Sequence, residues 1–423
     1  MTLALGIDIG TSGVRVVAMD RGGGVVAMSH VPMAAPQRDG AAVTQDADVW
    51  WAALEAALHG MADQVEFAHV RAIAIDGTSG TIVPVDRAGA PLAAATMYND
   101  ASASAIAAGF ARLAPPETAS LGATSPLARA IAIGRPAALA RILHQADWVA
   151  GRLLGRFDLS DENNALKTGY DPVARRWPDW IASTGLDPAL LPEVRPAGAP
   201  YGAITPAMAR HFGLPADVLI VAGTTDGCAA FLATGASAAG DGVTSLGTTL
   251  TLKLLSARPV FAPEYGIYSH RIGDTWLAGG ASNTGGAALL AHFTAAQMTA
   301  LEPALDPATP TGFDYYPLAA AGERFPVNDP AFRPRVSPRP ASDAVYFQGL
   351  LEGIAAVEAL GYRRLAELGA TPLASLRSLG GGAANAAWTT IRQRALSVPF
   401  LPSPSLEAAA GTARLAWRGL GVL

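Results

Sequence analysis

Strongly apolar runs that end in glycine and hydroxyl residues recur along this chain. Residues 3–9 (LALGIDI) predict a buried strand, and VRVVAM at 14–19 predicts a second one. The GTSG between these runs predicts a tight turn, because Gly10 and Gly13 can adopt positive φ. The first twenty residues therefore predict a strand–turn–strand unit.

The same pattern returns later in the chain. VTSLGTTLTLKLL at 243–255 repeats it closely, and AIAIDGTSGTIVPVD at 72–86 repeats it more loosely. The turns at Gly10 and Gly247 lie about 237 residues apart. We interpret these two copies as the same element in two related halves of the chain.

Apolar residues at helical spacing occupy long segments between the predicted strands. The pattern predicts a helix over 48–64 with Asp46 or Asp48 as its N-cap, and a second helix over 348–370 that stops at Gly369. A third is expected over 405–421, beginning at Ser405. The proline-rich stretches at 303–310 and 334–340 predict ordered surface loops.

Composition narrows the class of protein. The chain has 423 residues, of which 50% are apolar and 15% charged, so we expect two or three domains around large cores. A net charge of −5 offers no basic surface for nucleic acid. The single cysteine, Cys228, excludes a disulfide framework and a thiolate zinc site. We expect no membrane span, because no 18-residue apolar stretch occurs, and a cytoplasmic location, because MTLALGIDIG lacks a basic leader region.

The two matched turns predict phosphate binding. A tight turn directs successive backbone N–H groups into one concavity that suits an anion, and Thr and Ser hydroxyls add donors. One such cup is expected at Gly10, Thr11 and Ser12, and the other at Gly247, Thr248 and Thr249. Neither Lys167 nor Lys253, the only lysines, follows a GxxxxG loop, and VAIK and HRD segments are missing. The pattern therefore excludes P-loop and protein-kinase phosphate sites.

Two carboxylates accompany these turns. Asp8 precedes the first cup by two residues, and Mg²⁺ resolves the repulsion between a carboxylate and phosphates. The alternative for Asp8 is a capped strand end or a salt bridge. Asp226 follows the buried strand in DVLIVAGTTDG, where a carboxylate can act as a general base. An ordinary helix N-cap is the alternative for Asp226.

Together these segments resemble the FGGY family of carbohydrate kinases, in the actin-like ATPase superfamily. The resemblance rests on GIDIGTSGVRVVAMD, IDGTSGTIVPVDRAGAPL, MYNDASA, LSDENNALKTGYDP, AGTTDGCAAFLATGA, TSLGTT, GGASNTGG, GGGAANAAW and EAAAGTARLA, in that order. Within the family the chain is similar to the short D-ribulose kinase group of cyanobacteria and plant plastids, also called xylulokinase-like, because DYYPL, GERFP and IDGTSGT occur in it.

The resemblance implies an α/β fold of two ribonuclease-H-like domains with an ATP cleft between them. The N-terminal domain is expected over 1–233, joined by a C-terminal helix at 405–423, and the C-terminal domain over 234–404. It implies ATP and Mg²⁺ as cofactors, Asp226 as catalytic base, Asp8 as the metal residue, and the two turns as phosphate holders. The segment GGGAANAAW implies adenosine binding by Gly381, Gly382 and Asn385, with Trp388 against the base. The alternative for Trp388 is a plain core residue.

The residues that contact the sugar in the family are matched less completely in this chain. Our candidates are Asp8, Ser79, Asn99, Asp100 and Asp226. The Met-His pair of xylulokinases is replaced by Thr81 and Ile82, which counts against D-xylulose, and the Arg of a Trp-x-Asp-x-Arg motif is missing after Tyr98.

The expected reaction is ATP-dependent phosphorylation of a ketopentose, most simply D-ribulose to D-ribulose 5-phosphate. D-Xylulose, L-ribulose and a tetritol remain alternative substrates. From other classes, an actin- or Hsp70-like ATPase would need partner-binding segments, and a ROK-type repressor would need a helix-turn-helix or a cysteine-rich zinc loop. The expected partner is a small sugar, with no nucleic acid or membrane partner, in a monomer or homodimer.

Overall fold

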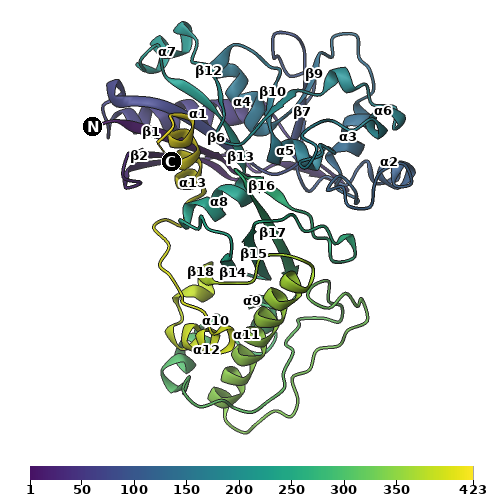
Figure 1. Cartoon of the computed structure of the whole chain (residues 1–423), viewed down its shortest axis with the longest axis vertical. Helices are drawn as coiled ribbons and strands as arrows, with labels where there is room; N and C mark the ends of the chain where they lie inside the picture. Colours follow the sequence, from purple (N-terminus) through teal and green to yellow (C-terminus); the bar gives the residue numbers. More distant parts are fainter. Residues whose placement is uncertain (423) are drawn as a thin grey trace. The chain divides into compact units, whose positions relative to one another are not determined.

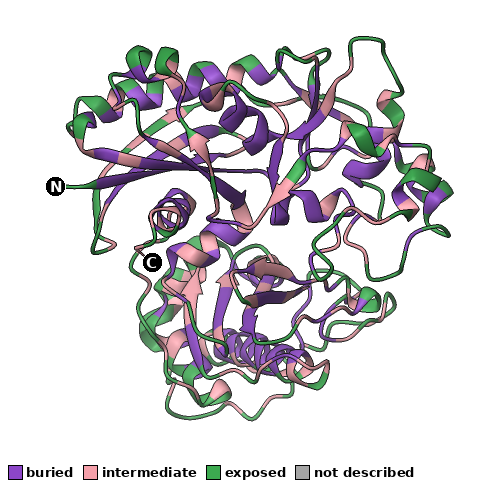
Figure 2. Ribbon diagram, turned by 45° about the horizontal axis from the view of Figure 1, so that its top comes forward, coloured by how far each residue is buried: buried purple, intermediate pink, exposed green. Residues whose placement is uncertain are grey.

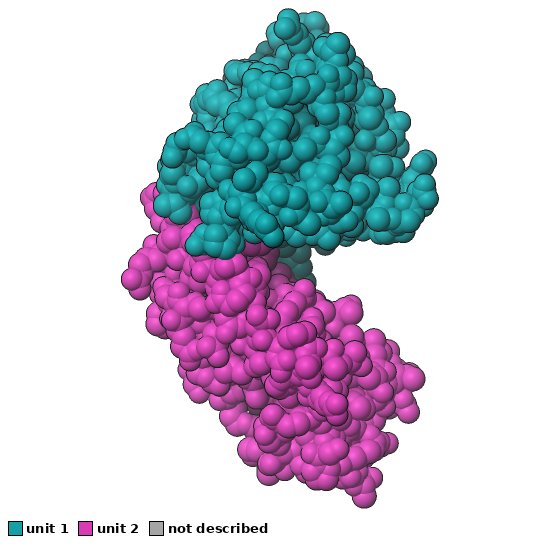
Figure 3. Space-filling view, turned by 90° about the vertical axis from the view of Figure 1, so that its right-hand side faces the viewer, with its two compact units in different colours: residues 1–235, 405–423 teal, residues 236–404 magenta. Residues whose placement is uncertain are grey.

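The computed structural model describes residues 1–422 (Figure 1). The chain divides into two compact units, which Figure 3 colours separately. Unit 1 comprises residues 1–235 together with the segment that begins at Ser405, and unit 2 comprises residues 236–404. Within residues 1–422, no helix combines the length and apolar character needed to cross a bilayer.

Unit 1 is built on a six-stranded mixed sheet. Its strand order is β12 (Pro200–Ala203), β13 (Leu219–Thr225), β6 (Val70–Gly77), β1 (Leu3–Ile9), β2 (Gly13–Asp20) and β3 (Val25–Pro32). Strands β1, β6 and β13 run parallel to one another, whereas β2 and β3 continue from β1 as an antiparallel meander. The carboxyl ends of three neighbouring strands therefore meet at one edge of the sheet.

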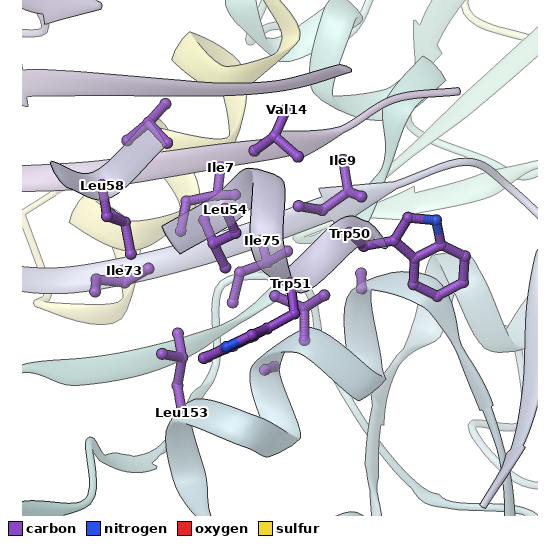
Figure 4. Packing of buried hydrophobic residues seen from close by; sticks show 14 of the residues in the cluster. Ile7, Ile9, Val14, Trp50, Trp51, Leu54, Leu58, Ile73, Ile75 and Leu153 are labelled. Carbon is purple, nitrogen blue, oxygen red and sulfur yellow. The ribbon is translucent and has the colours of Figure 1, made fainter. Parts of the chain in front are cut away.

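Alternation along β1 divides the residues between two cores. Leu5, Ile7 and Ile9 face the cluster that contains helix α1 (Ala47–Ala62), as Figure 4 shows for Ile7, Ile9 and Trp50. Ala4 and Gly6 face the other side, where helix α13 (Ala408–Gly419) packs. A Cβ at Gly6 would lie 1.9 Å from the carbonyl oxygen of Ala409, so only glycine admits this helix so close to the sheet.

Unit 2 repeats the meander and one parallel pairing of this sheet. Its sheet has the order β16 (His270–Ile272), β17 (Thr275–Ser282), β15 (Leu250–Ser256), β14 (Asp241–Leu246) and β18 (Ser375–Leu379). β14 pairs antiparallel with β15 and parallel with β18, as β1 does with β2 and β6. The interpretation of two related halves is therefore confirmed by the connectivity of each unit.

Helices α11 (Asp343–Glu367) and α12 (Ala386–Leu396) complete the core of unit 2. Figure 2 shows the strands and the long helix α11 as buried through much of their length. Inside this core, Arg392 forms a two-point ion pair with Glu358, and both side chains are inaccessible to solvent.

The remaining elements surround these two sheets. Unit 1 adds the strands β4 (Gln37–Asp39), β5 (Ala42–Gln45), β7 (Ile82–Val85), β8 (Ala95–Thr96), β9 (Arg141–His144), β10 (Leu159–Asp161) and β11 (Glu193–Arg195), and the helices α2 (Ser104–Phe110), α3 (Pro126–Ile133), α4 (Gln145–Leu154), α5 (Glu162–Lys167), α6 (Trp180–Ser183), α7 (Pro206–Phe212) and α8 (Asp226–Ala233). Unit 2 adds α9 (Gly286–Leu290) and α10 (Ala295–Leu301), and short 3₁₀ turns lie at Phe67–His69, Pro188–Leu190, Pro263–Tyr265, Glu302–Ala304 and Gly381–Ala384.

Three sequence-based predictions need correction. The looser copy at 72–86 is no hairpin, because β6 and β7 belong to different sheets. Helix α11 begins at Asp343 and is capped by Ser342, five residues before the predicted start. Helix α13 begins at Ala408, and Ser405 accepts a hydrogen bond from the amide of Glu407 before the helix starts. The loop predicted at 303–310 is confirmed from residue 305 onward, and its first two residues belong to the 3₁₀ turn Glu302–Ala304.

Candidate active site

Three aspartates gather where the parallel strands of unit 1 end. Asp8 on β1 and Asp76 on β6 are paired across the sheet, and Asp226 follows directly after β13. The period of two places Asp8 and Asp76 on the face that α13 covers. Strand pairing and alternation thus bring together carboxylates that are far apart in the sequence.

Asp8 and Asp76 form a buried acidic pair. Asp8 is 5% exposed, and its Oδ2 accepts a hydrogen bond of 3.2 Å from Arg15, so the salt-bridge alternative for Asp8 describes a real contact. Asp76 is fully buried and accepts a hydrogen bond from the Thr412 hydroxyl on α13. Burial raises the pKa of both carboxyls, and the charge of Asp8 raises the pKa of Asp76 further. Two carboxyls this close resist ionising together, and the hydrogen bond and charge of Arg15 favour the ionised form of Asp8.

Asp76 was missed by our sequence analysis. Its signal was a single charged residue inside the apolar run RAIAIDG, at a position that resembles Asp8 in the first copy of the repeat. In unit 2 the position equivalent to Asp8, the second residue before the hairpin turn, is Ser245, which pairs with Leu379. The acidic pair is therefore a property of unit 1 alone.

Asp226 is the first residue of helix α8, at the end of a buried strand. Thr225 occupies the N-cap position, so the interpretation of Asp226 as the N-cap is wrong. Its Oδ1 accepts a hydrogen bond of 2.7 Å from the amide of Gly227, and its side chain is partly exposed. The first turn of a helix is a favourable position for an acidic side chain.

The two predicted phosphate turns are hairpin turns in their respective units. In unit 1 the amide of Gly10 donates to the carbonyl of Gly13, while Thr11 is partly exposed and Ser12 is exposed. The carbonyl of Ser12 accepts a hydrogen bond from the amide of Met33, which fixes the turn against the end of β3. This turn begins two residues after Asp8.

In unit 2 the turn is braced from its carbonyl side. The carbonyls of Gly247 and Thr248 accept hydrogen bonds of 2.8 and 3.0 Å from Gly286 and Ala287, at the start of α9. Gly247 and Thr248 are exposed, and Thr249 is partly exposed. Each turn is therefore a fixed backbone feature with hydroxyl side chains at the surface of its own unit.

The sugar candidates separate into two kinds. Ser79 Oγ and Asn99 Oδ1 are buried and have no hydrogen-bond partner within residues 1–422. Leaving such groups unpaired costs about 1–3 kcal/mol each, so they are suited to receive a polar ligand. Asp100, in contrast, is 1% exposed and uses both oxygens within the fold, with Val43 and Ser102 as donors. Asp100 therefore holds this loop in place, and its role as a sugar contact stays a prediction.

The GGGAANAAW segment follows β18 as a 3₁₀ turn and the start of α12. Asn385 is the N-cap of α12, and its Oδ1 accepts a hydrogen bond of 2.7 Å from the amide of Trp388. The indole of Trp388 is 4% exposed, lies in the core of unit 2 and donates to the carbonyl of Leu351. A Cβ on Gly382 would lie 2.5 Å from this ring. This geometry is that of the plain core residue, the alternative given for Trp388, and the Gly382 turn rests on its ring. The contact between Trp388 and adenine stays a prediction.

Comparison with known proteins places this geometry in a family. Residues 3–118 and 133–233 match the N-terminal domain of the FGGY family of carbohydrate kinases, and residues 242–420 match the C-terminal domain of that family. The chain is 28% identical to the xylulose kinase of Escherichia coli K12 over 346 residues, which are 77% of this chain and 70% of that enzyme. L-Fuculokinase of Salmonella typhi is also 28% identical, over 58% of this chain and 52% of that enzyme.

Solved structures share the fold over nearly the whole chain. A kinase from Brucella ovis, described as a xyloylose kinase, superposes with a TM-score of 0.86 at 23% identity, covering 99% of this chain and 91% of that one. Plasmodium falciparum glycerol kinase with ADP gives a TM-score of 0.85 at 17% identity, covering 100% and 90%. Since the two family matches together span most of the sequence, the protein belongs to the FGGY family of carbohydrate kinases and is a sugar phosphotransferase.

Proposed function

We propose that this protein uses ATP to phosphorylate D-ribulose to D-ribulose 5-phosphate. The observation that carries the proposal is the position of Asp226. It is a partly exposed carboxylate at the end of a buried parallel strand, and the neighbouring strands end in the Asp8–Asp76 pair and the Gly10–Ser12 turn. A base beside a phosphate-binding turn is the arrangement that transfer to a hydroxyl group requires.

In the proposed reaction, Asp226 accepts the proton of the sugar hydroxyl as its oxygen bonds to the γ-phosphorus of ATP. The bond from that phosphorus to the bridging oxygen breaks, and ADP leaves with the bonding electron pair. Backbone amides of the turns at Gly10 and Gly247 would hold the phosphates, and the turn at Gly381 and Gly382 with Asn385 would hold adenosine. Positioning and charge stabilisation supply most of the acceleration in such transfers.

The residues of unit 1 fit a Mg²⁺ ion. Within residues 1–422 no group of three or more His, Cys, Asp or Glu side chains is arranged to hold a metal. Mg²⁺ does not need such a group, because it takes one or two carboxylates together with phosphate oxygens and several waters. Asp8 is the carboxylate we propose for it, two residues before the phosphate turn. When bound with ATP, the ion supplies positive charge to the phosphate oxygens.

Ser79 and Asn99 are the sugar contacts that we propose beside Asp226. Both carry buried polar atoms without a partner in the described chain, which hydroxyl groups of a sugar can satisfy. Thr81, where xylulokinases carry part of a Met-His pair, is fully buried, and its hydroxyl bonds to Thr78 and to the amide of Tyr98. This position therefore offers no imidazole to a sugar. D-Xylulose is the second candidate, favoured by the xylulose kinases among the relatives.

A substrate panel tests the proposal. ADP release should be measured with D-ribulose, D-xylulose, L-ribulose, L-fuculose, erythritol and glycerol, each at several concentrations, and product mass should confirm the gain of one phosphate. We expect the highest kcat/KM with D-ribulose and slow turnover without sugar. A kcat/KM at least tenfold higher with D-xylulose would transfer the assignment to that sugar.

A further inference from the structure

A group of buried polar residues lies at the start of helix α5 in unit 1. Ser160 to Asn164 are five consecutive polar residues, and each is at most 1% exposed. Polar groups are excluded from protein interiors unless hydrogen bonds compensate for their lost hydration. The partners of these side chains therefore indicate what the segment does.

Asp161 and Asn164 form the base of the group. Asp161 Oδ1 accepts hydrogen bonds from the amides of Asn163 and Asn164, at 2.8 and 3.0 Å, and so caps α5. Asp161 Oδ2 accepts a bond of 2.7 Å from Asn164 Nδ2. Because Asn164 Nδ2 faces two acceptors, these hydrogen bonds determine which end of its amide is the nitrogen.

Both asparagines also reach strand β13. Asn164 Nδ2 donates to the carbonyl of Thr224 at 3.1 Å, and Asn163 Nδ2 donates to the Thr224 hydroxyl at 3.0 Å. Thr224 is fully buried and lies two residues before Asp226. One residue of β13 is thus held at two atoms by a segment about sixty residues earlier in the chain.

The sheet itself is irregular at this point. The register between β13 and β6 shifts between Val221 and Thr224. A Cβ at Gly223 would lie 1.6 Å from the carbonyl oxygen of Ile75, so the backbone is pressed against β6 there. Pairing with β6 resumes at Thr224 and Thr225, so the two asparagines add side-chain contacts to a strand end that follows a bulge.

We propose that Asn163 and Asn164, braced by Asp161, are positioning residues that fix Thr224 and thereby aim the Asp226 carboxylate. The inference rests on the proposed role of Asp226 as base. A carboxylate that is displaced by about 1 Å can lose on the order of a hundredfold in rate, so an anchor two residues away acts on kcat.

The first test compares two amide deletions. Asn164→Leu removes the bonds to Thr224 and Asp161, whereas Gln348→Leu removes a buried amide that holds the carbonyls of Asp306 and Thr309 in unit 2. We expect kcat to fall about 10–100-fold in Asn164→Leu, with both KM values within about threefold, and to stay within twofold in Gln348→Leu. A kcat within twofold of wild type in Asn164→Leu would overturn the inference.

A charge exchange separates anchoring from helix support. Asp161→Asn combined with Asn164→Asp restores complementary partners at the α5 cap but places a carboxylate against the Thr224 carbonyl. Compared with Asn164→Leu, we expect the melting temperature of this double variant to recover at least in part, while its kcat remains low. Full recovery of kcat would mean that the pair only supports α5.

A milder variant and a second readout cover the remaining outcomes. Thr224→Val keeps the shape of the side chain but removes the acceptor for Asn163, and we expect about a fivefold loss of kcat. Hydrogen–deuterium exchange of the 219–233 peptide should rise in Asn164→Leu; unchanged exchange would contradict the anchor. If exchange rises in Asn164→Leu while Asp226→Asn keeps full activity, the anchor is upheld but Asp226 is not the base.

Discussion

Replacing Trp388 with alanine tests whether this side chain is a core residue or a direct contact to adenine. The indole is 4% exposed, packs in the core of unit 2, donates to the carbonyl of Leu351 and supports Gly382. Truncation of a buried tryptophan costs about 3–5 kcal/mol. A shift of about 2–4 °C per kcal/mol for domains of 150–250 residues gives a fall in melting temperature of about 6–20 °C.

The assay is thermal unfolding combined with steady-state kinetics at a temperature where the variant is folded. Trp276→Ala is the matched control, because Trp276 is also a buried tryptophan of unit 2 but lies on β17. We expect both variants to lose stability, and only Trp388→Ala to raise the KM for ATP as well, through the loosened Gly382 turn. A melting temperature within 2 °C of wild type together with a large rise in the KM for ATP would refute the core assignment.

Three further outcomes follow from the buried charges. Asp8→Ala should raise the Mg²⁺ concentration needed for half-maximal activity more than the sugar KM, and an unchanged Mg²⁺ titration would leave Asp8 as a structural residue. Glu358→Gln should cost about 3–5 kcal/mol by breaking the buried pair with Arg392, whereas Glu358→Leu with Arg392→Met should recover much of it; denaturant unfolding measures both. Burial and the charge of Asp147 raise the pKa of Asp161 to about 6 in the folded protein. The unfolded pKa of Asp161 is near 4, so this group's contribution to the free energy of unfolding is fully present below about pH 4 and is lost as the pH rises to about 6. Asp161→Asn should remove up to about 3 kcal/mol of that pH dependence, and parallel unfolding curves for both proteins across this range would contradict it.

The hairpins around Gly10 and Gly247 were predictable because apolar alternation is local, although neither Gly10 nor Gly13 adopts the positive φ that we expected. The same local pattern at 72–86 was misleading, since strand pairing is decided by tertiary contacts: β7 pairs with β9, a strand almost sixty residues later. Helix boundaries shifted for a similar reason, as α13 begins only where the chain meets β1 and α8. Fold class was therefore readable from the sequence, and sheet assignment was not.

In the candidate site, too, local motifs predicted some residues, and tertiary contacts decided the others. Asp8 and Asp226 were found because each lies beside a turn motif, whereas Asp76 lies in the looser copy of the repeat and its partnership with Asp8 is seen only from the strand pairing. The hydrogen bonds of Asp100 and the burial of Trp388 depend on tertiary contacts, which the motifs that contain these residues do not show. The anchor from Asn163 and Asn164 to Thr224 joins segments about sixty residues apart, and no local pattern encodes it.

The central claim is that Asp226 is the base of a sugar kinase, and Asp226→Asn tests it most directly. Product formation from ATP and D-ribulose should be followed by mass in a single turnover, with ATP affinity measured separately and Asp46→Asn, at the cap of α1, as the matched control. General-base removal costs about 10²–10⁴-fold, so we predict that loss in rate with unchanged ATP affinity, and a control near wild type apart from stability. A variant that retains more than half of the wild-type rate would contradict the account.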